Sequence, residues 1–242
     1  MENIWGRLKE PQNISLYTGI STEEGSTDVT KSTIRQKVWE FMERNDIANF
    51  PRPVYNRIPN FKGASAAGDK VSTLPEFRDA KTVKVNPDKP QEEVRFRVLD
   101  AGKTLIVPTP RLTQGLFNRL EAEPDCTKES LRKMSSRYGI DSLSKPIPMA
   151  SRLKVDLVVV GSVAVDRLGR RIGKGEGFAD LEYAMAASHH SAVTQETVVI
   201  STVHDVQVFD ELPQSLFSAH DLPVDIIVTP TEVSIDTRGT AY

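Results

Sequence analysis

The sequence has little cysteine, little net charge and no long apolar run. Cys126 is its only cysteine among 242 residues, so no disulfide can form within the chain, and a reducing compartment, the cytoplasm or the nucleus, fits. The 31 Lys and Arg residues against 33 Asp and Glu leave a formal charge of −2. Such a balance gives no global attraction to nucleic acid or acidic membranes, so any anion site must be local.

Apolar segments are also too short to cross a membrane. The longest, Val155–Val165, has the length of a strand and is interrupted by Asp156. Residues Met1–Thr27 are polar and lack the apolar stretch of a secretory signal. No membrane partner is therefore expected.

Composition and periodicity divide the chain into three parts. Residues 1–29 lack sustained periodicity, and we expect a flexible tail there. Residues 30–236 are expected to form one α/β domain. Residues 237–242 are expected to begin a linker to a C-terminal region outside this sequence.

Strand-like and helix-like patterns alternate within the domain. A helix is expected from Lys31, with Ile34, Val38 and Met42 on its apolar face and Thr30 or Ser32 as its N-cap. Strands are predicted at Thr82–Val85, Thr104–Val107, Val155–Val165, Thr197–Val203, Asp225–Thr229 and Val233–Ile235. Helices are predicted at Asp88–Ala101, Leu112–Leu120, Lys128–Tyr138, Phe178–Ala187 and Leu216–His220. This alternation predicts an α/β three-layer sandwich, a mostly parallel sheet with helices on both faces.

The most informative stretch is a glycine-rich segment between a predicted strand and a predicted helix. Gly173, Gly175 and Gly177 alternate, so no side chain blocks a ligand lying along the backbone. A loop of this kind before a helix aims backbone N–H groups at phosphate. Three cations, Arg170, Arg171 and Lys174, stand beside the glycines, and Asp180 stands where a metal could be held.

This segment matches neither of the two commonest phosphate-binding motifs. A Walker A loop needs a Lys-Ser/Thr pair after its last glycine, and the dinucleotide fingerprint spaces its glycines differently. The alternative is a surface turn in which glycines supply positive φ and the arginines are merely solvated.

The pattern Gly169-x-Arg171-x-Gly173-x-Gly175-x-Gly177-Phe178-x-Asp180 resembles the signature of 5-formyltetrahydrofolate cyclo-ligases, also called 5,10-methenyltetrahydrofolate synthetases. The resemblance spans about residues 31–236. Four further segments follow in that family's order: Lys31-x-x-x-Arg35, Asp88, Gly102–Pro108 and Leu222–Thr229.

A divergent branch of that family is more similar still. Its methenyltetrahydrofolate synthetase domain-containing members share Phe50–Pro53, Ile58–Gly63, Pro87–Pro90 and Pro108–Arg111 with this sequence. Full-length animal members carry a C-terminal RNA-recognition motif. This sequence contains no RNP-like aromatic segment, so the resemblance implies RNA contact through a module beyond it.

The resemblance also implies a chemistry. In the enzymes, ATP phosphorylates the formyl oxygen of 5-formyltetrahydrofolate, an amine of the pterin attacks, and phosphate leaves. Such transfer needs charge neutralisation and alignment. The residues implied to bind ATP are Lys31, Arg35, Gly173, Lys174, Gly175, Glu176, Gly177 and Phe178. Arg171 is implied to hold phosphate and Asp88 the folate, as catalytic residues, while Asp180 would coordinate Mg²⁺.

Each of these residues also has a structural interpretation. Lys31 and Arg35 could lie on a solvated helix face, and Arg171 could form an exposed ion pair with Glu176, worth roughly 0–1 kcal/mol. Asp180 could favour the helix dipole, and Asp88 could be an N-cap.

Several positions depart from the enzyme pattern. Asp88 stands for a glutamate, Lys174 for an arginine, Glu176 for a lysine and Phe178-Ala179 for two tyrosines. Nucleotide binding is therefore better supported than turnover. The expected function is that of a diverged ATP- and folate-binding domain of an RNA-associated protein. The alternatives are an active ATP- and Mg²⁺-dependent cyclo-ligase and a protein-interaction module.

Overall fold

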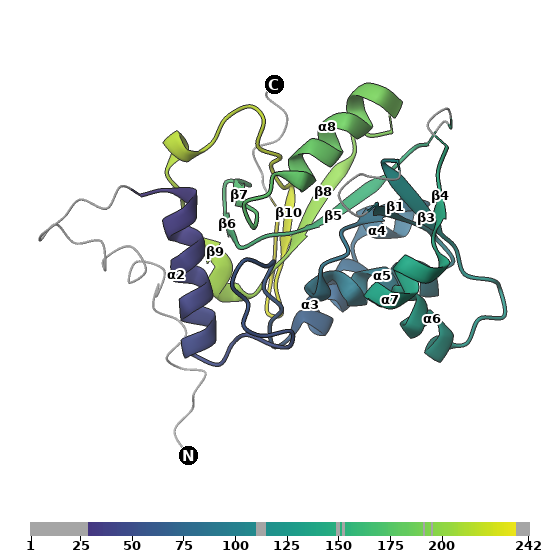
Figure 1. Cartoon of the computed structure of the whole chain (residues 1–242), viewed down its shortest axis with the longest axis horizontal. Helices are drawn as coiled ribbons and strands as arrows, with labels where there is room; N and C mark the ends of the chain where they lie inside the picture. Colours follow the sequence, from purple (N-terminus) through teal and green to yellow (C-terminus); the bar gives the residue numbers. More distant parts are fainter. Residues whose placement is uncertain are drawn as a thin grey trace, which may run out of the picture.

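The structure, a computed structural model, is built around one eight-stranded mixed sheet (Figure 1). It describes residues 29–109, 115–148, 151, 153–190, 192–194 and 196–235. The predicted tails, 1–29 and 237–242, lie outside these residues, apart from Val29. In the described part of the chain, no helix is long and apolar enough to cross a membrane.

Most strand pairs of this sheet are parallel. The strands follow the order β11-β10-β8-β5-β1-β2-β3-β4. The parallel strands are β1 (Thr82–Val85), β2 (Thr104–Pro108), β5 (Leu157–Gly161), β8 (Val198–Thr202) and β10 (Ile226–Val228). Antiparallel strands extend both edges: β3 (Phe117–Leu120), β4 (Lys145–Pro146) and β11 (Val233–Ile235).

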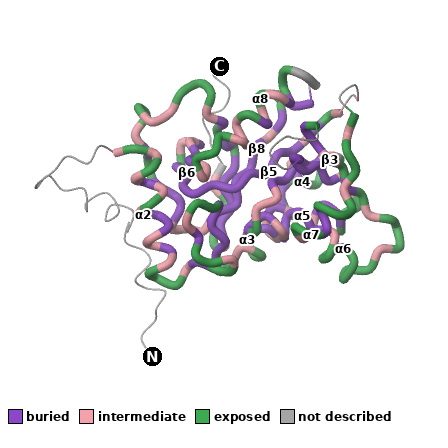
Figure 2. The backbone as a smooth tube through the Cα atoms, viewed as in Figure 1, coloured by how far each residue is buried: buried purple, intermediate pink, exposed green. Residues whose placement is uncertain are grey.

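Both faces of the sheet are buried, which explains its continuous β-branched runs. On β5, Leu157 and Val159 join one apolar cluster, while Val158 and Val160 join a second cluster on the opposite face. Figure 2 shows the buried residues concentrated in these central strands.

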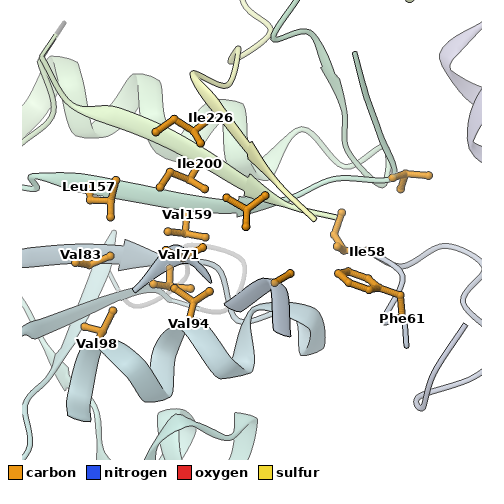
Figure 3. Close-up of a cluster of buried hydrophobic side chains, with 14 of the residues drawn as sticks. Ile58, Phe61, Val71, Val83, Val94, Val98, Leu157, Val159, Ile200 and Ile226 are labelled. Atoms are coloured by element: carbon orange, nitrogen blue, oxygen red, sulfur yellow. The ribbon is translucent and has the colours of Figure 1, made fainter. Parts of the chain in front are cut away.

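Helices cover both faces, as the sequence predicts. Figure 3 shows part of the larger cluster, in which strand residues Val83, Leu157, Val159, Ile200 and Ile226 lie near helix residues Val71, Val94 and Val98. The helices of this cluster are α2 (Lys31–Arg44), α3 (Ala64–Val71), α4 (Pro75–Asp79), α5 (Glu92–Asp100), α6 (Lys128–Ser135) and α7 (Arg137–Leu143). On the other face, α8 (Phe178–His190) contributes Ala186 to the second cluster.

The predicted strand Val155–Val165 is wrong as a single element. After β5 the chain leaves the main sheet at Ser162, and β6 (Ala164–Asp166) enters a three-stranded sheet with β7 (Arg171–Ile172) and β9 (Val208–Phe209). The Gln207 side-chain amide donates to the carbonyl oxygens of Ser162 and Val163 at 2.9 and 3.0 Å. These bonds replace the strand ladder at the break, so the buried carbonyls stay satisfied.

The predicted helix Leu112–Leu120 is also wrong. Residues 110–114 lie outside the described part, and Phe117–Leu120 forms β3, paired antiparallel with β2. Leu116, Phe117 and Leu120 have a spacing typical of a helix, but pairing with a neighbouring strand outweighs it.

Other predicted helices differ from the structure in their bounds or their type, and α8 extends to His190. The pattern at Lys128–Tyr138 divides into α6 and α7, because Ser136 ends the first and accepts the Gly139 amide to cap the second. Asp88–Ala101 begins as a 3-10 turn, Lys89–Gln91, before α5. Leu216–His220 is not a helix; a 3-10 turn covers Gln214–Leu216 instead, and a further one covers Asp205–Gln207.

Substitution of Leu105, which is fully buried on β2, tests the core assignment. We expect Leu105→Ala to lower the free energy of unfolding by about 2–5 kcal/mol, because it leaves a cavity inside the larger cluster. Leu181→Ala on α8 makes the same chemical change at a side chain that is 49% exposed, and should cost under about 0.5 kcal/mol. Urea unfolding measures both; equal losses would contradict the described packing.

Candidate functional site

A cavity of about 400 Å³ lies where three parallel strands end. Its walls come from the segments that follow β1 and β2, from Gly161 at the end of β5, from α7, and from the loop that leads into α8. Ligands of α/β sheets gather at this carboxyl edge, and the volume falls within the range of small-molecule sites.

The glycine loop forms one wall of the cavity. Gly175 and Gly177 have φ of +105° and +68°, which side-chain-bearing residues rarely adopt. In the described part of the chain, the backbone amides of residues 174–180 have no hydrogen-bond acceptor. These amides span the loop and the first turn of α8, so they form a continuous set of free donors beside the cavity.

Arg171 is the cation that lies deepest beside this loop. Its side chain is 3% exposed and lines the cavity. Its Nη2 donates to Asp180 Oδ1 at 2.7 Å, and its Nε, which is buried, has no partner among the described residues. The predicted exposed pair with Glu176 is therefore wrong; Arg171 pairs with Asp180 in the interior.

Lys174 and Glu176 neutralise each other instead. Their side chains approach to 2.9 Å, and both line the cavity at its more exposed end. The charge that Glu176 adds is thus balanced locally by Lys174. Phe178, Gly173 and Gly177 line the same region.

Lys31 and Arg35, the two cations from α2, lie behind the loop. Arg35 Nε donates to the carbonyl oxygen of Gly173 at 2.6 Å, and burial lowers the pKa of Arg35. A Cβ at Gly175 would lie 3.3 Å from the Arg35 guanidinium carbon. Lys31 Nζ donates to Asp221 Oδ1. Neither cation lines the cavity, so their present contacts support the loop and its surroundings, and neither lies on a merely solvated face.

Asp88 lines the cavity on the side formed by the segment after β1. Asp88 occupies the N-cap position of the turn that follows, as expected, but its side chain makes no cap hydrogen bond there. Burial raises the pKa of Asp88, and the nearby Lys174 and Arg95 only partly oppose this effect. Arg95, fully buried with its pKa lowered to about 10 by burial, donates to the backbone carbonyl oxygens of Asn86 and Asp88 at 2.7 and 2.9 Å.

One of the two carboxylate oxygens of Asp180 is hydrogen-bonded within the protein. Its Oδ1 accepts from Arg171 and from the Leu222 amide at 3.0 Å, which leaves Oδ2 without a partner in the described residues. Those residues contain no group of three or more His, Cys, Asp or Glu side chains that could hold a metal. One free carboxylate oxygen fits Mg²⁺ if phosphate oxygens and water supply its other ligands, as is common for this ion.

Sequence reasoning missed four polar residues of this site. Lys84 and Glu182 form a buried ion pair beside the cavity, Asn86 lines it, and Arg95 holds the backbone that carries Asp88. A lysine inside the apolar strand Thr82–Val85 is the signal that could have found this pair.

Substitution of Asp88 tests its raised pKa. The folded protein keeps this proton above the ordinary value of 3.8, so the free energy of unfolding should fall as the pH rises from 3.8 through the raised pKa. Asp88→Asn cannot titrate and should lack this decline, so it should be the more stable protein near neutral pH. Urea unfolding across an acid-to-neutral pH series measures the difference; parallel curves would refute the assignment.

Comparisons with known proteins agree with this fold. A profile of the 5-formyltetrahydrofolate cyclo-ligase family matches residues 27–230. The chain is 53% identical over 210 residues to the methenyltetrahydrofolate synthase domain-containing protein of Bos taurus, covering 87% of this chain and 55% of the relative. It is 55% identical over 204 residues to that of Danio rerio, covering 84% and 53%.

Among solved structures, the 5,10-methenyltetrahydrofolate synthetase of Aquifex aeolicus has a TM-score of 0.53 and 24% identity, covering 88% of this chain and 95% of that one. This likeness shows the fold. The chain spans about half the length of the curated relatives it matches. By the family profile and these relatives, the chain belongs to the 5-formyltetrahydrofolate cyclo-ligase family.

Proposed function

We propose that this domain binds a nucleoside triphosphate of the ATP type, with its phosphates at the glycine loop, together with a folate-type ligand in the cavity. The observation that carries the proposal is the run of free amides from residue 174 to 180 beside a buried, incompletely paired Arg171. Free amides at a helix N-terminus, backed by a guanidinium, favour a phosphate group.

The charged side chains around the glycine loop support the proposal that phosphate binds there. Arg171 shares its charge with one carboxylate oxygen of Asp180 and keeps Nε unpaired. Within the described residues Lys174 pairs with Glu176 alone, at the more exposed end of the cavity, so an incoming phosphate can exchange with that carboxylate at little cost. Lys31 and Arg35 would act from behind, by holding the loop in place.

Asp88, in the segment after β1, supports a folate-type ligand in the cavity. A carboxyl group donates a hydrogen bond only when it is protonated, and burial shifts Asp88 toward that form by raising its pKa, which suits a ring or formyl group rich in polar atoms. The bond from Arg95 to the Asp88 carbonyl oxygen fixes the backbone that presents this carboxyl.

Mg²⁺ would accompany the triphosphate. Asp180 Oδ2, free in the described residues, is the oxygen of this chain that would face the ion, while Oδ1 stays with Arg171. When bound, the ion neutralises phosphate charge. The protein's own contribution is to hold Arg171 and the loop amides in a fixed orientation before the ligand arrives.

Turnover of 5-formyltetrahydrofolate to 5,10-methenyltetrahydrofolate is the second candidate. It is favoured by Asp88, because burial raises the pKa of this carboxyl and so disfavours a negative charge near the group being phosphorylated. Glu176 argues for binding without turnover, because it adds a carboxylate to the loop. In the longer relatives this domain is about half of the protein; we extend the proposal to an RNA-associated protein whose RNA contacts lie outside this sequence.

Calorimetric titration with Mg-ATP tests the binding proposal. We expect Lys174→Met to weaken binding about tenfold, because it removes one charge-assisted phosphate contact. Arg119→Met makes a comparable change at an exposed cation that does not line the cavity, and should bind like the unmodified chain. No heat from the unmodified chain, or equal weakening by both variants, would contradict the proposal.

Optical detection of ring closure tests the second candidate. The protein is mixed with Mg-ATP and 5-formyltetrahydrofolate, and absorbance of 5,10-methenyltetrahydrofolate is followed. Product that scales with protein concentration and falls in Arg171→Lys, which loses the two-pronged guanidinium, would establish turnover. Binding of both ligands without product would leave the first proposal alone.

A further inference from the structure

Part of the cavity wall is formed by Asn86 and Glu182, which we call the floor. Glu182 forms a buried ion pair with Lys84 there, and the proposed phosphate site does not use this pair. Lys84, on β1, is 3% exposed, and Glu182, on α8, is 5% exposed. Lys84 Nζ donates to Glu182 Oε2 at 2.7 Å and to Asn86 Oδ1 at 2.6 Å. Asn86 and Glu182 both line the cavity, so the lysine holds two cavity residues at once.

Stability alone does not account for this pair. Taking two charges out of water costs several kcal/mol each, and well-packed apolar residues in their place are often as stable or more so. The same strand is otherwise apolar at its buried positions, Val83 and Val85. A lysine here therefore suggests a role in orienting the groups that it contacts.

Lys84 fixes which atoms of its partners face the ligand. An ammonium has only donors, so it can accept neither amide hydrogen, and the Asn86 atom that meets it must be the oxygen. Asn86 Nδ2 is thereby directed away from the lysine, and it has no acceptor among the described residues. Glu182 Oε2 is occupied, while Oε1 receives no hydrogen bond in the same part of the chain.

The floor thus offers one amide donor and one carboxylate acceptor, grouped around a single ammonium. Asp88 belongs to the same region, because the charges of Glu182 and Lys84 act on its pKa in opposite directions. This is the part of the cavity that the proposed function gives to the folate-type ligand.

We propose that Asn86 and Glu182, oriented by Lys84, recognise a lactam edge, a ring N–H beside a ring carbonyl. The N–H donates to Glu182 Oε1, and the carbonyl oxygen accepts from Asn86 Nδ2. The 4-oxo ring of a folate-type pteridine carries such an edge. This inference rests on the proposed function and deepens it, because it names the groups that select the ligand.

A matched pair of ligands tests the inference on the unmodified chain. Folic acid has a 4-oxo group beside N3–H, whereas its 4-amino counterpart has a donor at position 4 and an acceptor at N3. We expect folic acid to bind at least about tenfold more tightly than the 4-amino ligand. The 4-amino ligand places a donor against Asn86 Nδ2 and an acceptor against Glu182 Oε1, so both side chains would lose their hydrogen bonds. Equal affinities, or tighter binding of the 4-amino ligand, would overturn the assignment.

Two single substitutions should reduce this preference. In Glu182→Gln, Lys84 holds the new amide oxygen and the new NH₂ faces the ligand, so an acceptor becomes a donor; Asn86→Asp does the reverse. Glu129→Gln on α6 removes the same charge at an exposed side chain that does not line the cavity, and it should keep the full preference. Unchanged preference in both floor variants, or equal loss in Glu129→Gln, would refute the roles given to these residues.

Failure of the inference and failure of the proposed function give different results. If the unmodified chain binds folic acid and its 4-amino counterpart equally, the cavity binds a folate-type ligand but Asn86 and Glu182 do not distinguish the two ring edges. If it binds neither these ligands nor 5-formyltetrahydrofolate, both proposals fall. Should the floor variants not fold, Lys84→Met/Glu182→Leu replaces the pair with apolar residues and must likewise lose the preference.

Discussion

The ion pair between Arg171 and Asp180 is the contact on which the site depends. It joins the short strand β7 to the first turn of α8, and the Leu222 amide adds a third element through the same carboxylate oxygen. The residues between the two partners must therefore turn sharply, which Gly175 and Gly177 permit with positive φ. Removal of Asp180 would leave the buried guanidinium of Arg171 without its charged partner, so this pair maintains both the fold and the cavity wall.

Anion-binding groups and carboxyl groups meet around the cavity. Arg171, Lys174 and the free amides gather at the loop, together with the carboxylates of Glu176 and Asp180. Asp88 comes from the segment after β1, and the charges of Lys174 and Glu182 both act on its pKa. A ligand pair with an anionic end and a hydrogen-bonding ring would find partners for both parts here.

Sequence reasoning predicted the parts of the fold that depend on local pattern. Thr30 caps α2 and Thr127 caps α6 as expected, and β1 has the predicted bounds. The break after Gly161 was not predictable, because it depends on the side chain of Gln207, more than forty residues away. The same holds for the site: the glycine loop is a local motif, whereas the Lys84–Glu182 pair joins a strand to a distant helix.

The central claim is that the free amides before and within the first turn of α8 receive phosphate. Amide chemical shifts from a two-dimensional ¹H–¹⁵N spectrum, recorded while Mg-ATP is added, report on these groups directly. The account predicts progressive shifts concentrated at residues 174–180 and little change at the opposite end of the sheet. Shifts that avoid this segment, or are absent altogether, would contradict it.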